Sequence, residues 1–157
     1  MNQTKKKILF IVNPVSGVHQ SRKAMLTNLA DEVLDKQRFE WQIVFSESAD
    51  QVRELSREAA EAGTDIIAAV GGDGTVNQVV KGLYGSNSVL ALIPAGSGNG
   101  LAHHLGIPVE TVESLALINT MNVKQIDTIS INNDLFVSIA GVGFDALVAR
   151  KFAKAGR

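Results

Sequence analysis

The feature that most constrains the fold is the alternation of short apolar runs with helical patterns. The run Ile8–Val12 is apolar throughout, which is typical of a strand buried on both faces. Helical and strand-length patterns then alternate, at residues 21–36 (helix), 41–45 (strand), 49–62 (helix), 65–70 (strand), 75–84 (helix), 89–93 (strand), 101–105 and 109–120 (helices). This order predicts βαβ units, and therefore an α/β fold with a mainly parallel sheet covered on both faces.

The pattern changes near residue 124. Residues 125–132 and 135–140 predict two strands joined by a tight turn at Asn133-Asp134, which is a β-hairpin. We therefore expect one domain over residues 1–123 and the first strands of a β-rich second domain over residues 124–157. Because the sequence ends at Arg157 in a helical pattern just after this hairpin, we expect the chain to be a fragment of a longer protein.

Composition argues against several classes of function. A net charge of −1 and an aromatic content of 5% disfavour nucleic-acid binding. The absence of cysteine excludes disulfides, thiolate metal sites and cysteine nucleophiles, and favours an intracellular location. The apolar run after Lys5–Lys7 ends at Asn13-Pro14, which is short for a signal peptide, and no run approaches the roughly 20 residues of a membrane span. We expect a soluble, cytoplasmic protein.

Glycine-containing loops follow three of the predicted strands. Val70 runs directly into Gly71-Gly72-Asp73-Gly74-Thr75, and a helix follows at once. Glycines let backbone N–H groups approach a phosphate closely, and a helix N-terminus adds a favourable dipole. The loops Asn13–Gly17 and Pro94–Gly100 also follow strands. Since the carboxyl ends of parallel strands share one edge of a sheet, the three loops together predict a nucleotide-phosphate site.

Asp73 is the unusual member of these loops, because a carboxylate beside phosphates repels them unless it has a function. It could hold Mg²⁺ or accept a proton from an attacking hydroxyl. The alternative is a simple turn whose Asp caps a helix. Neither Gly-x-Gly-x-x-Gly after the first strand nor Gly-x-x-x-x-Gly-Lys-Ser/Thr is present, which argues against a dinucleotide fingerprint and a P-loop.

Longer motifs around the loops resemble the diacylglycerol kinase catalytic domain. They are Asn13-Pro14 with Ser16-Gly17, residues 71–83 (GGDGTVNQVVKGL) and residues 94–102 (PAGSGNGLA). NAD kinases share Gly-Gly-Asp-Gly-Thr, but the third loop favours the lipid kinases. The resemblance implies an NAD kinase-like α/β domain that binds ATP, followed by a β-sandwich domain. It also implies transfer of the ATP γ-phosphoryl group, with Mg²⁺, to a primary hydroxyl of a diacylglycerol or sphingoid lipid.

The resemblance further implies roles for individual residues. Asp73 would be the catalytic carboxylate and a metal contact, Asp127 would join the metal network indirectly, and Asp145 would contact the lipid substrate. The residues expected to bind the nucleotide are Asn13, Pro14, Ser16, Gly17, Ser46, Gly71, Gly72, Gly74, Thr75, Val76, Asn77, Gly96, Ser97, Gly98 and Asn99.

Two departures from the family pattern leave the lipid open. Gly100 stands where many bacterial diacylglycerol kinases carry Asp, and Gln78 stands where the family often carries Glu. NAD kinase and a non-catalytic nucleotide-binding fragment remain alternatives. As a lipid kinase, the protein would meet its substrate at the membrane surface, as a peripheral protein with no transmembrane segment. A homodimer is left open. His103 and His104 are adjacent on a predicted helix, so we expect them to be surface or packing residues and not paired metal ligands.

Overall fold

The computed structural model describes residues 4–13, 19–138, 143, 146–148 and 150–151. The strands and helices alternate as the sequence predicts, and the α/β fold is confirmed. In chain order they are β1 (Lys6–Val12), α1 (His19–Val33), β2 (Phe39–Phe45), α2 (Ala49–Glu61), β3 (Ile66–Gly71), α3 (Asp73–Leu83), β4 (Val89–Pro94), α4 (Gly100–Leu105), α5 (Thr111–Thr120), β5 (Ile129–Ile131) and β6 (Asp134–Phe136).

The first four strands form one parallel sheet in the order β2-β1-β3-β4. Val12 lies opposite both Phe45 and Val70, and Gly71 lies opposite Pro94, so the strands end at a common edge. The chain proceeds outward from β1 to β2, and then in the other direction from β3 to β4. Ligands of open α/β sheets bind where the direction changes in this way, at the carboxyl ends of the strands.

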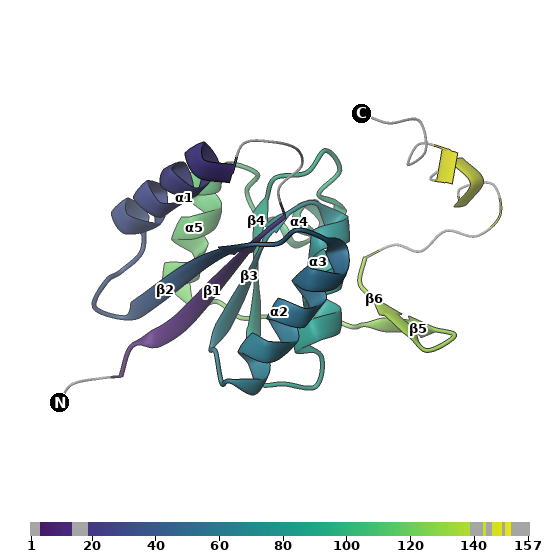
Figure 1. The fold of residues 1–157 in the computed structure, drawn as a ribbon, viewed down its shortest axis with the longest axis horizontal. Helices are drawn as coiled ribbons and strands as arrows, with labels where there is room; N and C mark the ends of the chain where they lie inside the picture. Colours follow the sequence, from purple (N-terminus) through teal and green to yellow (C-terminus); the bar gives the residue numbers. More distant parts are fainter. Residues whose placement is uncertain (1–3, 14–18, 139–142, 144–145, 149, 152–157) are drawn as a thin grey trace.

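Helices cover both faces of this sheet (Figure 1). Alternate residues of β1 point to opposite faces, so Phe10 packs with α1 and α5 while Ile11 packs with α2, α3 and α4. Both side chains are fully buried. The nearly continuous apolar strands therefore divide the core into two layers, one on each side of the sheet.

Helices α2 and α3 approach each other closely at Gly82. A Cβ atom on Gly82 would lie 2.5 Å from the carbonyl oxygen of Arg53 and 2.6 Å from Cβ of Ser56. The Ser56 hydroxyl donates to the carbonyl oxygen of Val79 at 2.8 Å. This contact holds α3, whose first turn carries Asp73, against α2.

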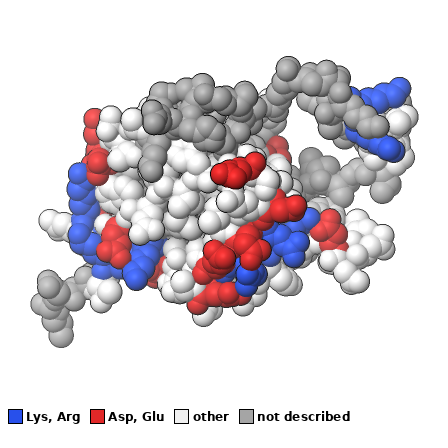
Figure 2. Space-filling view, viewed as in Figure 1, with Lys and Arg blue, Asp and Glu red and all other residues white. Residues whose placement is uncertain are grey.

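The outer face of α2 carries interspersed acidic and basic side chains (Figure 2). Arg57 contacts Glu54 at 2.5 Å and Glu61 at 2.7 Å. The hydrogen bonds to Glu54 and Glu61 raise the pKa of Arg57, so the guanidinium stays charged. None of the helices that the structure describes combines the length and the apolar character needed to span a bilayer.

The antiparallel hairpin β5–β6 confirms the predicted change of pattern after α5, with two differences. The strands are shorter than predicted, since residues 125–128, 137 and 138 lie outside them. The turn is centred on Asn132 and Asn133, one residue before the predicted position. Both residues have positive φ, at 51° and 64°, as a type I′ turn requires and as Asn tolerates. The boundary between two domains near residue 124 stays a prediction.

Candidate functional site

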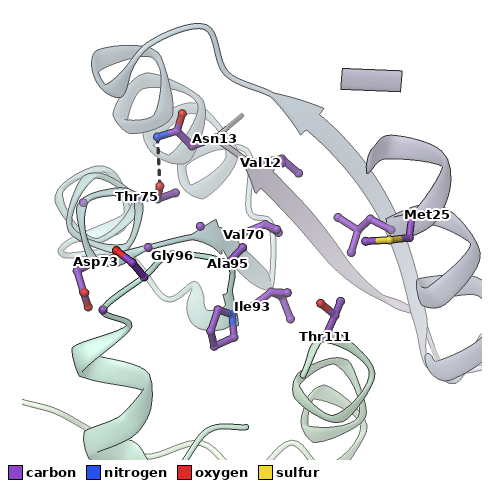
Figure 3. A pocket seen from close by; sticks show the side chains of 17 residues that line it. Val12, Asn13, Met25, Val70, Asp73, Thr75, Ile93, Ala95, Gly96 and Thr111 are labelled. Carbon is purple, nitrogen blue, oxygen red and sulfur yellow. Dashed lines mark hydrogen bonds between the residues drawn. The ribbon is translucent and has the colours of Figure 1, made fainter. Parts of the chain in front are cut away.

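A cavity of about 490 Å³ lies at the carboxyl ends of β1, β3 and β4 (Figure 3). Glycine loops form one side of it, and Met25, Leu26 and Ile93 form an apolar side. The volume is within the range of small-molecule sites, roughly 300–1,000 Å³. The lining residues are Val12, Asn13, Met25, Leu26, Val70, Gly71, Gly72, Asp73, Gly74, Thr75, Ile93, Pro94, Ala95, Gly96, Ser97, Gly98 and Thr111.

The second and third glycine loops pack against each other through bare backbone. A Cβ atom on Gly96 would lie 2.5 Å from Cα of Gly72, and one on Gly72 would lie 3.1 Å from Cα of Gly96. The N–H of Ala95 donates to the carbonyl oxygen of Gly71 at 2.9 Å. These two glycines are therefore needed for the contact between the loops, whatever ligand the cavity takes.

The first turn of α3 faces the cavity. Gly72 is the N-cap residue, with extended backbone and no side chain to bind the first N–H groups of the helix. Gly74 is exposed, and a Cβ atom there would meet nothing within 4 Å. Thr75 is buried and accepts a hydrogen bond from Nδ2 of Asn13 at 3.3 Å, which joins the first loop to the second (Figure 3). Within the described ranges, no Lys or Arg lines the cavity.

Among the described residues, Asp73 is the one acidic residue that lines the cavity. It lies at the end opposite Met25 (Figure 3). Its Oδ1 accepts a long hydrogen bond from the N–H of Leu101, at 3.4 Å, in the first turn of α4. A Cβ atom on Gly98 would lie 3.0 Å from its Oδ2. The carboxylate thus lies between the cavity and the third loop.

Asn99 closes the third loop on itself. It has a left-handed backbone with φ of 50°, its Oδ1 accepts from the N–H of Gly96 at 3.0 Å, and its Nδ2 donates to the carbonyl of Gly96 at 2.8 Å. The side chain is used within the loop and does not line the cavity. The nucleotide contact that the sequence suggested for Asn99 stays a prediction.

Four more residues with predicted roles lie away from the cavity lining. Ser46 is fully buried and its hydroxyl donates to the carbonyl of Val12 at 3.3 Å. Val76 packs in the core under α3, and Asn77 is hydrogen-bonded elsewhere. Asp127 is exposed in the segment between α5 and β5. The remaining predicted residues, Pro14, Ser16, Gly17 and Asp145, lie outside the described residues.

The apolar side of the cavity was missed by the sequence analysis. Met25 and Leu26 lie on α1, for which the sequence predicted only a helix, and Thr111 starts α5. Their place beside the cavity depends on how α1 packs against the sheet, where Leu26 joins the core layer that contains Val70 and Ile93. That packing could not be read from residue spacing.

Comparison with known proteins places these features in a family. Residues 7–131 match the diacylglycerol kinase catalytic domain. The chain is 40% identical over 106 residues to the "Probable lipid kinase YegS-like" of Chromohalobacter salexigens, which covers 65% of this chain and 34% of that protein. It is 34% identical over 142 residues to the diacylglycerol kinase of Bacillus subtilis, which covers 88% of this chain and 46% of that protein.

The fold agrees with the same relatives. A crystal structure of a diacylglycerol kinase from Bacillus anthracis has a TM-score of 0.72 at 25% identity, and the alignment covers 98% of this chain and 55% of that one. The chain thus spans between a third and a half of the length of the two curated relatives. Since the family match extends over most of its residues, the chain belongs to the diacylglycerol kinase catalytic domain family.

Proposed function

We propose that this chain supplies the nucleotide-binding part of an ATP-dependent lipid kinase, which transfers the γ-phosphoryl group to a primary hydroxyl of a diacylglycerol or sphingoid lipid. The observation that carries the proposal is the wall formed by two stacked glycine loops, the N-terminus of α3 and the carboxylate of Asp73. Relatives named as lipid kinase and diacylglycerol kinase support the class of reaction.

The two sides of the cavity suit the two ends of a nucleotide. Phosphates would lie over Gly74 and the first turn of α3, where the helix dipole and free N–H groups favour negative charge. The adenine would lie on the apolar side, against Met25 and Ile93. Ligand sites generally combine an apolar wall with a few polar groups that fix orientation, as here.

Mg²⁺ fits the donor set of this wall when it arrives with the nucleotide. Protein sites commonly hold Mg²⁺ through one or two carboxylates together with substrate phosphates. Asp73 would be that carboxylate, and among the described residues no group of three or more His, Cys, Asp or Glu could hold a metal ion alone. Bound Mg²⁺ would neutralise phosphate charge. The described residues that line the cavity include no Lys or Arg that would do so.

The chain's own residues would contribute mainly position and electrostatics, as phosphoryl transfer generally requires. The loop contact between Gly72 and Gly96 fixes the phosphate wall. Asp73 lies at the edge of the cavity, where it could orient the lipid hydroxyl and accept its proton. The Leu101 N–H holds the carboxylate there.

The reaction is tested with the full-length protein, γ-labelled ATP, Mg²⁺ and vesicles that contain diacylglycerol, sphingoid base or ceramide. We expect label in one class of lipid. A parallel reaction contains NAD in place of lipid. Label in NAD alone would contradict the lipid kinase and support the NAD kinase alternative. Nucleotide binding without transfer to any acceptor would support a non-catalytic module.

The role of Asp73 is tested by Asp73→Asn, which keeps a side-chain oxygen for the Leu101 N–H but removes the negative charge. We expect kcat to fall by about 10²–10⁴-fold, as on loss of a general base. The matched control is Asp31→Asn on α1, whose partner is the exposed Lys36, and it should retain full turnover. Full activity of Asp73→Asn would rule out a catalytic role for this carboxylate.

A further inference from the structure

Asn77 joins two parts of the molecule through one side chain. Its Nδ2 donates to the carbonyl oxygen of Asp73 at 3.2 Å, and its Oδ1 accepts from the N–H of Val137 at 2.8 Å. One partner is an acceptor and the other a donor, so the orientation of the amide is determined by its surroundings. An amide of this length supplies both functions, whereas a carboxylate supplies acceptors alone.

The hairpin β5–β6 lies along one face of α3. Asp73, Asn77 and Lys81 are spaced four residues apart, which places them on the same side of the helix. Lys81 contacts the carboxylate of Asp134 at 2.5 Å, at the start of β6, and Asn77 binds the backbone of Val137 just after β6. The hairpin therefore runs along this face toward Asp73.

The chain that leaves the hairpin passes beside the candidate catalytic carboxylate. Val137 is 2% exposed and packs in the core layer under α3. The next residue, Ser138, has φ of 79°, a left-handed conformation that favours glycine. A Cβ atom on Gly100 would lie 3.6 Å from both Ser138 Oγ and Asp73 Oδ1. The bond from Asn77 to Val137 thus fixes the backbone next to Ser138, whose hydroxyl and the Asp73 carboxylate both lie close to Gly100.

We propose that Asn77 is a positioning residue that couples the docked hairpin to the backbone of Asp73, and that it acts on turnover and not on nucleotide affinity. This inference rests on the proposed kinase function. Asn77 does not line the cavity, and both ends of its amide are already hydrogen-bonded within the chain. It differs from the nucleotide contact that the sequence suggested for the same residue.

Three variants of the full-length protein separate the two hydrogen bonds. Asn77→Ala removes both, and Asn77→Asp keeps an acceptor for the Val137 N–H while it loses the donor to Asp73. Lys81→Met removes the ion pair on the same face of α3 and serves as the matched control. For each we measure kcat, the Kd of ATP, and backbone hydrogen exchange of residues 73–77 and 134–138. Thermal unfolding confirms that each variant folds.

For Asn77→Ala we expect faster exchange at residues 134–138 and a kcat lowered by about tenfold, the scale of one part-buried hydrogen bond, with the Kd of ATP unchanged. Asn77→Asp should retain slow exchange at 134–138, raise exchange at residues 76 and 77, whose N–H groups are hydrogen-bonded within α3, and also lower kcat. Lys81→Met should leave kcat unchanged, because the partner carboxylate of Asp134 is 72% exposed and ion pairs that reach solvent contribute little.

Three outcomes would overturn the inference. The first is a loss of ATP affinity that parallels the loss of kcat. The second is hydrogen exchange at 134–138 that does not respond to Asn77→Ala. The third is faster exchange at 134–138 with an unaltered kcat. If wild-type protein phosphorylates no lipid, the proposed function fails on its own. The exchange of residues 73–77 in Asn77→Asp then still decides whether the hairpin and the Asp73 turn are coupled.

Discussion

Three asparagines each bind a backbone donor and a backbone acceptor with a single side-chain amide. Asn77 joins α3 to the hairpin, Asn99 closes the third loop, and Asn119 joins α5 to the end of α1. Asn99 and Asn119 lie where a loop or a helix end leaves backbone groups without a regular partner, whereas Asn77 lies within α3. Because an amide offers both a donor and an acceptor, these sites accept Asn where Asp or Leu would leave one group unsatisfied.

The glycines of the site fall into two kinds, and a pair of variants distinguishes them. Gly96→Ala puts a Cβ atom 2.5 Å from Cα of Gly72, so backbone must move, and we expect about 1–3 kcal/mol lower stability. At Gly74 a Cβ atom meets nothing within 4 Å. Gly74→Ala should therefore be as stable as wild type or more stable, by about 0.4–1 kcal/mol in the free energy of unfolding. Its added methyl should weaken ATP binding.

Urea unfolding and ATP titration of both variants check this division. Equal stability of Gly96→Ala and wild type would mean that the two loops do not touch in solution. Unchanged ATP affinity of Gly74→Ala would remove Gly74 from the predicted phosphate site. Neither result depends on the identity of the lipid.

At the scale of elements, Asn119 holds the end of α1 against α5. Its Nδ2 donates to the carbonyl of Val33 at 2.7 Å, and its Oδ1 accepts from the N–H of Asp35 at 3.0 Å. Asn119→Ala leaves both backbone groups unpaired in a part-buried place, so we expect about 1–3 kcal/mol of destabilisation by chemical unfolding. Asn87→Ala, at an exposed position after α3, is the matched control and should be near neutral. A stability equal to wild type in Asn119→Ala would show that water replaces these bonds without cost.

Most strands and helices could be predicted from the sequence, because apolar periodicity determines which segments are buried. The ends were harder to place. Helix α3 begins at Asp73, two residues before the predicted start, because Gly72 is the N-cap residue. The hairpin turn was misplaced by one residue because Asn-Asn and Asn-Asp are both acceptable turn pairs, and the register of β5 with β6 decides between them.

The site was predictable only in outline. Loops that follow neighbouring strands must meet, so the contact between the second and third loops follows from the sheet. The partners of Asn77 and Asn99 do not follow, because both residues sit in motifs that also suit a nucleotide contact. Ser46 is similar: it follows β2, an edge strand, and its hydroxyl is buried against Val12. Which side a polar side chain faces depends on tertiary packing, and residue spacing does not contain that information.

At the scale of the molecule, the two faces of the sheet contribute different sides of the cavity. The layer of α2, α3 and α4 carries the glycine-loop side of the cavity with Asp73 and packs against the hairpin, whereas α1 and α5 supply residues of the other side (Figure 1). Every described residue that lines the cavity lies in the range from Val12 to Thr111. The proposed nucleotide site and the attachment of the hairpin therefore use different parts of α3, its first turn and the face that starts at Asn77.

This separation predicts the behaviour of a chain cut after residue 123, at the expected domain boundary. It lacks Val137, which is 2% exposed and packs under α3, so its stability should fall. Its cavity keeps every described lining residue, so ATP at about 100 times its Kd should add about 2.7 kcal/mol of stability to both chain lengths. Thermal unfolding with and without ATP measures this difference. A shortened chain that folds cooperatively but shows no stabilisation by ATP would mean that residues after 123 complete the nucleotide site, and the boundary would then cut through it.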